Sequence, residues 1–239
     1  MDEKRPAYGR ILLKLSGEAL SGDAKNKFDF DVMENICRAV TRCVKLGVQV
    51  GVVVGGGNFW RGAKDEGFRI ERTRSDYMGM MATVMNALAL ADVFERMGAP
   101  VDVQSAFGIP GVAESYSRQR AISCLDQGHV VIFGGGTGHP YFSTDTTAVL
   151  RALEIGADAL LLAKNVDGVY NGDPALDPNA TLFASLSYDQ VLSGRLKALD
   201  LTATALAEEN RIPVHVFALK DPENILRVVM GEQNGTLIS

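Results

Sequence analysis

The chain has 239 residues, of which 46% are hydrophobic and 22% are charged, and its formal net charge is −5 at pH 7. This composition excludes a disordered chain, and the acidic balance argues against a nucleic-acid binder while leaving room for a local cationic pocket that binds anions. No run of about 18 uninterrupted apolar residues occurs and the first residues are charged, so we expect no membrane span, no signal peptide and a cytoplasmic protein.

Short apolar segments alternate with amphipathic segments along the whole chain. We expect strands at residues 10–15, 48–54, 101–106, 129–133, 158–163, 213–219 and 235–238. We expect helices at residues 31–46, 75–98, 117–127, 146–156, 201–210 and 222–231. Turn-forming pairs between positions 166 and 183 predict a hairpin or a loop excursion over one edge. The alternation predicts an α/β fold, a three-layer α/β/α arrangement with a mainly parallel central sheet, in a single domain that spans residues 1–239.

Two triple-glycine segments, residues 55–57 and 134–136, each stand at the end of an expected strand. Glycine lets backbone N–H groups approach an anion closely, and a following helix N-terminus favours negative charge. Neither segment is a Walker A loop or a dinucleotide fingerprint, because the chain has no Gly-Lys pair and Trp60 and His139 occupy the third glycine positions. A shorter glycine turn at Gly17 adds a third loop of this kind. Together the loops predict two phosphate-bearing ligands, a donor and an acceptor. The alternative is that these glycines only make tight turns.

Phosphoryl transfer also needs charged groups beside such loops. Lys14 has apolar neighbours in "ILLKLSG", so we expect it to project from the end of its strand into the site. Arg61 closes the first triple-glycine loop, although exposed loop arginines are common. Asp145 and Asp200 each stand near an expected helix start, where they either serve as simple N-caps or orient lysine and Mg²⁺. An acceptor that is already an oxyanion needs no general base.

The order of six segments resembles the bacterial uridylate (UMP) kinases of the amino acid kinase superfamily over about residues 10 to 238. These segments are "ILLKLSGEAL", "VGVVVGGGNFWRG", "DYMGMMATVMNALAL", "GTGHPYFSTDTTA", "VDGVYNGDP" and "GEQNGTLI". The first and fifth segments occur across the superfamily and indicate only the fold. The combination of "DYMGMMATVMNALAL" with "TGHPYFSTD" is narrower and indicates the UMP-specific branch.

The resemblance implies ATP-dependent conversion of UMP to UDP in pyrimidine nucleotide biosynthesis, with Mg²⁺ bound to ATP. The implied charged transfer group is Lys14, Arg61, Asp145 and Asp200. The implied ATP contacts are Lys14, Leu15, Ser16, Gly17, Gly57, Arg61, Asn165, Tyr170 and Asp173, with the adenine side in residues 160–239. The implied UMP contacts are Gly56, Asp76, Thr137, Gly138, His139, Pro140, Tyr141, Phe142, Ser143 and Thr144. We expect no metal site made by the protein alone, since the three cysteines have no CxxC spacing and fit reduced core thiols.

The resemblance further implies a homohexamer built as a trimer of dimers and feedback inhibition by UTP, with no nucleic-acid or membrane partner. Three positions depart from the family pattern. His139 stands where the family usually has Asn, and "AKNVDG" places Lys164 and Asn165 differently from relatives. The segment after "SGEAL" matches the family's allosteric segment only loosely, so activation by GTP is not expected.

Two other functions compete with this one. A superfamily kinase could phosphorylate a carboxylate such as that of aspartate, glutamate or acetylglutamate, but such sites lack the "GTGHPYFSTD" loop in this form. A non-catalytic relative could sense or store nucleotides or oxyanions, but that function would fit better with a lost Lys14 or Asp200, and both are present.

Overall fold

The computed structural model describes residues 5–22, 27–60 and 70–239, and within them nine strands form one sheet in the order β4-β3-β5-β2-β1-β6-β8-β9-β7. The strands are β1 (Arg10–Leu15), β2 (Gln49–Val54), β3 (Val101–Ser105), β4 (Glu114–Ser115), β5 (Val130–Gly134), β6 (Ala159–Lys164), β7 (Ser185–Leu186), β8 (Val214–Ala218) and β9 (Thr236–Ile238). All neighbouring pairs are parallel except β8 and β9, which run antiparallel. The predicted mainly parallel sheet is confirmed.

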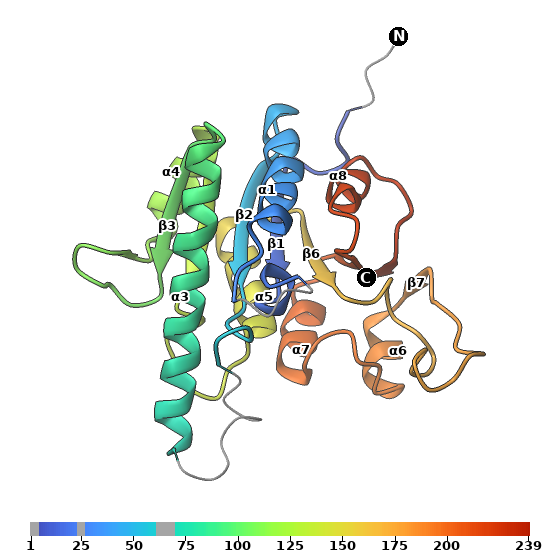
Figure 1. Cartoon of the computed structure of the whole chain (residues 1–239). Coiled ribbons are helices and arrows are strands. Elements are labelled where there is room, and N and C mark those ends of the chain that lie inside the picture. The colour runs from blue at the N-terminus through green and yellow to red at the C-terminus, as the bar shows by residue number, and fades with distance from the viewer. Residues whose placement is uncertain (1–4, 23–26, 61–69) are drawn as a thin grey trace.

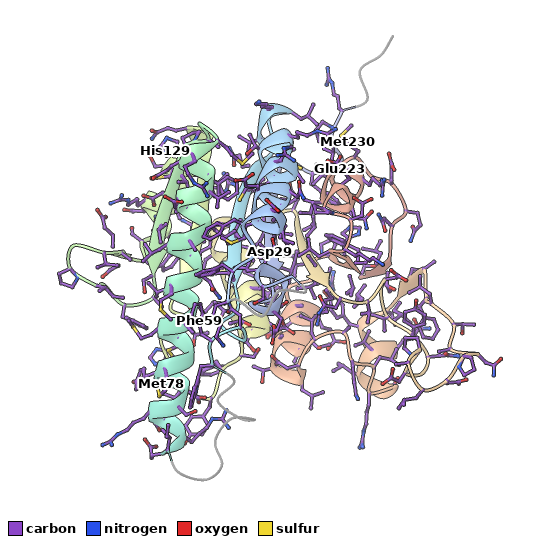
Figure 2. All side chains as sticks on the ribbon, viewed as in Figure 1. Asp29, Phe59, Met78, His129, Glu223 and Met230 are labelled. Atoms are coloured by element: carbon purple, nitrogen blue, oxygen red, sulfur yellow. The ribbon has the colours of Figure 1, made fainter. Side chains whose placement is uncertain are left out.

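Helices cover both faces of the sheet. They are η1 (Glu18–Leu20), a 3-10 turn, and α1 (Phe30–Lys45), α3 (Arg72–Arg96), α4 (Arg118–Asp126), α5 (Thr144–Ile155), α6 (Tyr188–Ser193), α7 (Leu201–Glu209) and α8 (Glu223–Val229). Alternate residues of β1 face opposite layers: Leu13 packs with α1, α3 and α8, and Leu12 packs with α4, α5 and α7. In Figure 1, α1 and α3 lie in front of the strands and α5 lies behind them. Side chains fill the space between the sheet and both helical layers (Figure 2), so the predicted three-layer α/β/α fold is confirmed.

Helix α3 is long and apolar enough to cross a membrane by length and composition alone, although polar residues interrupt its apolar sequence. In its most apolar stretch, however, 56% of the residues are buried inside the protein. Its buried face includes Ala87, Leu90 and Phe94, which belong to the same core as β2, β3 and β5. A helix that packs on a sheet in this way has the composition of a core helix.

The short elements are the ones that the sequence did not predict. Strands β4 and β7 have two residues each, and α6 has six. The predicted excursion between residues 166 and 183 is present as a hairpin-like loop, in which Tyr170 bridges Leu182 and the Asn171 N–H donates to the Thr181 carbonyl at 3.1 Å. Helix α5 starts two residues earlier than predicted because Ser143, and not Asp145, is its N-cap.

Candidate active site

The predicted loops meet at the carboxyl edge of the central strands. Because β5, β2, β1 and β6 are adjacent and parallel, the residues that follow them lie side by side, as at ligand sites of other α/β sheets. The loop after β1 and the loop after β2 are in direct contact. A Cβ atom on Gly17 would lie 2.6 Å from the Gly57 nitrogen and 2.9 Å from the Gly55 carbonyl oxygen. Position 17 therefore has no room for a side chain.

The loop after β5 has a backbone that only glycine adopts easily. Gly135, Gly136 and Gly138 have φ values of 76°, 59° and 81°. The loop then returns to the sheet edge and starts α5 at its N-cap, where the Ser143 hydroxyl accepts hydrogen bonds from the Asp145 and Thr146 N–H groups, both at 3.0 Å. Asp145 lies in the first turn of α5, so its interpretation as a simple N-cap is wrong.

Two lysines converge on the Asp145 carboxylate. Lys14 Nζ, from β1, lies 2.7 Å from Asp145 Oδ1, a contact that is ionic rather than a well-directed hydrogen bond. Lys164 Nζ, from the end of β6, lies 3.5 Å from Asp145 Oδ2 and donates to the Ala198 carbonyl at 2.5 Å. The Lys14 side chain is only 10% exposed, and its ammonium group meets Asp145 at the carboxyl edge of the sheet. We call Lys14, Asp145 and Lys164 the charged cluster.

Burial and charge act in opposite directions on this cluster. Burial alone would raise the pKa of the Asp145 carboxyl, but Lys14 and Lys164 together lower it below its ordinary value. Burial lowers the pKa of the Lys164 ammonium, and the attraction of Asp145 opposes that effect. The two ammonium groups can receive phosphate oxygens. The Asp200 carboxylate also acts on Lys164, so the two lysines and two aspartates balance in charge before a ligand binds.

Asp200 is the N-cap of α7, as one of its two interpretations predicted. Its Oδ1 accepts from the Ala203 N–H at 2.9 Å, its carboxylate accepts from the Ser143 hydroxyl, and Thr146 Oγ1 lies 3.3 Å from both of its oxygens. The cap therefore also joins α7 to the start of α5, beside Asp145. Within the described ranges, no group of three His, Cys, Asp or Glu side chains could hold a metal ion. Mg²⁺ at phosphoryl-transfer sites commonly takes one or two carboxylates together with substrate phosphates, and Asp200 beside Asp145 fits that arrangement.

A cavity of about 150 Å³ lies between α3 and the loops after β2 and β5. Five predicted UMP contacts line it: Gly56, Asp76, Thr137, Phe142 and Thr144. The Asp76 carboxylate accepts from the Tyr141 N–H at 2.8 Å and from Arg72 Nε at 2.9 Å.

The remaining predicted acceptor residues are in the same loop but outside the lining of this cavity. Gly138, His139, Pro140, Tyr141 and Ser143 do not belong to it. Tyr141 is largely exposed and has a φ of 71°, which is unusual for a residue other than glycine. The other lining residues are Trp60, Ser75, Gly79, Met80, Thr83 and Gly136.

The predicted adenine contacts divide between two places. Tyr170 and Asp173 line a cavity of about 340 Å³ between the hairpin-like loop and the segment that follows α6. A cavity of about 630 Å³ shares part of that segment and is also lined by Lys164 and Asp200, which connects the adenine side to the charged cluster. Asn165 instead lines a separate cavity with Asp29 and Lys220, so the structure does not bring it to Tyr170 and Asp173.

Two basic residues, Arg61 and Lys164, remain to be placed relative to the predicted site. Arg61, a predicted member of the charged transfer group, lies outside the described residues. Lys164 belongs to the charged cluster although its assignment was left open from the sequence. The available signal was a lysine at the end of the apolar run "ALLLAK", whereas Lys14 stands inside its apolar run.

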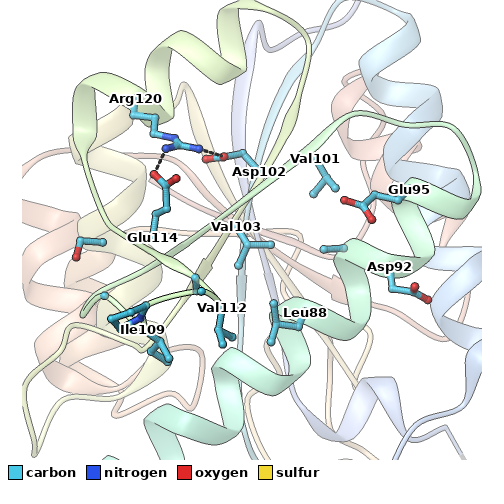
Figure 3. A pocket seen from close by; sticks show the side chains of 16 residues that line it. Leu88, Asp92, Glu95, Val101, Asp102, Val103, Ile109, Val112, Glu114 and Arg120 are labelled. Atoms are coloured by element: carbon cyan, nitrogen blue, oxygen red, sulfur yellow. Dashed lines mark hydrogen bonds and ion pairs between the residues drawn. The ribbon is translucent and has the colours of Figure 1, made fainter.

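A larger cavity, of about 1030 Å³, lies away from all of these residues, at the edge of the sheet formed by β3 and β4 (Figure 3). Its rim carries Asp92 and Glu95 of α3, and Arg120 forms ion pairs with Asp102 and Glu114 across one end. Its size does not make it the active site, because it lacks the glycine loops and the charged cluster.

The fold agrees with comparisons to known proteins. Residues 9–218 match the model of the amino acid kinase family. The chain belongs to the amino acid kinase family. Within that family it is similar to solved structures of UMP kinases. It shares 39% identity and a TM-score of 0.94 with the enzyme from Bacillus anthracis, over 98% of this chain and 97% of that one.

Two more solved structures extend this similarity. The UMP kinase from Ureaplasma parvum shares 34% identity and a TM-score of 0.91, over 99% of both chains. The uridylate kinase from Archaeoglobus fulgidus shares 30% identity and a TM-score of 0.73, over 96% of this chain and 99% of that one. All three similarities extend over nearly the whole chain.

Proposed function

We propose that this chain transfers the γ-phosphoryl group of ATP to UMP, giving ADP and UDP, as a step of pyrimidine nucleotide biosynthesis. The observation that carries the proposal is the charged cluster, which stands at the sheet edge where the three glycine-containing loops meet. The cavity lined by Asp76 adjoins the loops, and the cavity lined by Lys164 and Asp200 adjoins the cluster. The similarity to UMP kinases supports UMP as the acceptor.

On the acceptor side, we propose that Asp76 binds the ribose hydroxyls of UMP, which would replace its present contacts with Arg72 and the Tyr141 N–H. Gly56 and the segment from Thr137 to Thr144 would surround the uridine and its phosphate. Backbone N–H groups in that segment can approach a phosphate because Gly138 has a left-handed backbone. For His139, which lies in this segment, we propose only that it lies close to the bound UMP.

On the donor side, we propose that the ATP phosphates lie along the loop after β1, with Arg61 beside them. The proposed phosphate contacts are Lys14, Leu15, Ser16, Gly17, Gly57 and Arg61. Residues 160–239 would hold the adenine, with Tyr170 and Asp173 on one wall. We also propose that Asn165 contacts ATP, although it lines a cavity separate from that of Tyr170 and Asp173.

In the proposed reaction, a phosphate oxygen of UMP attacks the γ-phosphorus of ATP while the bond from that phosphorus to the bridging oxygen of ADP breaks. The attacking phosphate is largely doubly ionised at pH 7, since its second pKa is about 6, so no general base is needed. Lys14, Lys164 and Arg61 would place positive charge around the transferred group. Asp145 would hold both lysines in place. Mg²⁺, bound with ATP and held through Asp200 and Asp145, would supply further positive charge to the β- and γ-phosphate oxygens.

We also propose that the chain acts in the cytoplasm as a homohexamer that UTP inhibits. Four large apolar side chains of α3 are between 41% and 46% exposed: Tyr77, Met78, Met81 and Met85. Residues 77, 81 and 85 are four apart and share one face, which supports a contact with a second copy through α3. Light scattering coupled to gel filtration measures the assembly, and a titration of UTP into the kinase assay measures inhibition.

The experiment that tests the proposed function is a product assay with ATP, Mg²⁺ and one acceptor at a time. The acceptors are UMP, CMP, aspartate, glutamate and acetylglutamate, and chromatography separates the nucleotide products. We expect UDP from UMP and little product from the others. Product from a carboxylate alone would establish the superfamily alternative. Binding of UMP and ATP without turnover would establish the nucleotide sensor.

A further inference from the structure

Helix α3 carries three buried polar residues, Ser75, Thr83 and Asn86, and the last two hold the glycine loops. The segment "DYMGMMATVMNALAL" is apolar at most positions, yet Thr83 is 2% exposed and Asn86 is fully buried. A buried polar side chain is costly unless it is hydrogen-bonded. Its partners therefore indicate why it is there.

Asn86 holds the loop after β2. Its Nδ2 donates to the Gly55 carbonyl at 2.6 Å and to Asn58 Oδ1 at 2.8 Å. Asn58, itself buried, donates back to Asn86 Oδ1 at 3.0 Å and to the Lys27 carbonyl at 2.9 Å. Hydrogen bonds thus attach the first triple-glycine loop to α3 at Gly55, the first glycine, and at Asn58, the residue after the last glycine.

Thr83 holds the loop after β5. Its Oγ1 accepts from the Gly135 N–H at 2.8 Å and donates to the Met80 carbonyl, one turn back in α3, at 2.7 Å. Gly135 is the second glycine of its triple-glycine segment and has a left-handed backbone. The Thr83 hydroxyl satisfies its N–H while the loop turns away from the sheet.

The two attachments lie on one face of one helix. Thr83 and Asn86 are three residues apart, so their side chains project from neighbouring points of the same face. Asp76, which accepts from the Tyr141 N–H, lies two turns before Thr83. The helix also touches the loops with its backbone: a Cβ atom on Gly56 would lie 2.7 Å from the Gly79 carbonyl oxygen, and one on Gly134 would lie 3.2 Å from Val84 Cα. Both loops therefore take their position from the same rigid element.

We propose that Thr83 and Asn86 are positioning residues, which fix the two triple-glycine loops at the separation that phosphoryl transfer needs. The inference rests on the proposed function, in which these loops surround the two reacting phosphates. Asn86 acts through the Gly55 carbonyl that it holds, and Thr83, which also lines the cavity proposed for UMP, acts through the Gly135 N–H. A displacement of about 1 Å between reacting groups costs on the order of a hundredfold in rate.

The test compares Thr83→Val, which keeps the shape of the side chain and removes its hydroxyl, with Thr83→Ser, which keeps the hydroxyl. Both are assayed as the full chain with ATP and UMP varied separately. We expect Thr83→Val to raise the KM for UMP and to lower kcat/KM for UMP by about tenfold or more, because the substitution removes one buried hydrogen bond. The KM for ATP should be nearly unchanged. Thr83→Ser should stay within about threefold of the wild type. Asn86→Leu should lower kcat, because the Gly55 loop lies between both ligands.

Val93→Ala is the matched control on the same helix. Val93 is fully buried and lies far from both loops along α3, so its truncation lowers stability without releasing a glycine loop. A merely structural role predicts that Thr83→Val behaves like Val93→Ala, with lower thermal stability and unchanged KM values, and that result overturns the proposal. Faster amide hydrogen exchange at Gly135 in Thr83→Val, and not in Val93→Ala, would support it independently of activity.

The wild-type assay separates the two levels of failure. A wild-type chain that forms no UDP refutes the proposed function and removes this inference with it. A wild-type chain that forms UDP, together with unchanged kinetic constants in Thr83→Val and Asn86→Leu, refutes only the positioning role.

Discussion

The charged cluster predicts that Asp145→Asn destabilises the protein far more than an ordinary surface substitution does. The amide keeps the shape of the side chain but leaves the Lys14 ammonium 2.7 Å and the Lys164 ammonium 3.5 Å from a neutral group. Removing one partner of a buried ion pair costs about 3–5 kcal/mol. The Lys164 side chain is 24% exposed, so water recovers part of that cost, and we expect about 3 kcal/mol.

For a chain of this length, 3 kcal/mol corresponds to a fall in Tm of roughly 6–12 °C. Circular dichroism at matched protomer concentration measures it, because assembly also shifts Tm. Asp92→Asn is the matched control, since Asp92 makes an exposed pair with Arg96 on α3 at 3.0 Å. Such a surface pair contributes about 0.5 kcal/mol or less.

The effect of Asp145→Asn also depends on pH with a definite sign. The pKa of the folded-state Asp145 carboxyl lies below its ordinary value, so the stabilisation is fully present above about pH 4 and is lost as pH falls through the lowered pKa. The difference between wild type and Asp145→Asn should therefore be largest near neutral pH and shrink in acid. A loss at pH 7 no larger than that of Asp92→Asn would refute the account of the charged cluster.

Three further predictions concern the two ligand sides. Lys14→Met should lower kcat by at least about a hundredfold, while the UMP affinity measured by calorimetry should stay within about threefold of wild type. An equal loss of kcat and of UMP affinity would indicate a structural role. Asp76→Asn should raise the KM for UMP about tenfold and leave the KM for ATP nearly unchanged, and the opposite pattern would reverse the donor and acceptor sides. Gly17→Ala places a Cβ atom 2.6 Å from the Gly57 nitrogen, so it should lower the free energy of unfolding by about 1–3 kcal/mol and also lower activity. In the control Gly9→Ala the nearest neighbouring atom would be 3.5 Å from the new Cβ atom, so neither stability nor activity should fall. A harmless Gly17→Ala would show that the two loops can separate freely.

The sequence predicted the features that depend on neighbours in the chain. Hydrophobic periodicity located the long strands and helices, and a lysine inside an apolar strand located Lys14. The triple-glycine segments at strand ends located the loops. The predicted strands and helices are confirmed because each depends on the chemistry of one short stretch of residues, and distant parts of the chain do not change that chemistry.

The sequence did not predict the features that depend on which strand ends become neighbours. Lys164 meets Asp145 only because the chain crosses from β5 over β2 and β1 before it forms β6 beside β1. The sequence left open whether Asp145 caps α5, because Ser143 and Asp145 are both good cap residues and the attraction of two distant lysines to Asp145 is not visible locally. The contacts of Thr83 and Asn86 are not visible in the sequence, since their partners Gly135 and Gly55 lie 52 and 31 residues away.

The central claim is that UMP and ATP meet across the charged cluster, with the UMP phosphate in the loop after β5. A crystal structure with UMP and a non-hydrolysable ATP analogue tests it most directly. We predict that the UMP phosphate lies against the backbone of residues 137–144, that the ribose contacts Asp76, and that the γ-phosphate of the analogue lies beside Lys14 and Lys164. A UMP phosphate bound instead at Ser16 and Gly17, or a nucleotide bound only in the cavity between α3 and β4, would contradict the account.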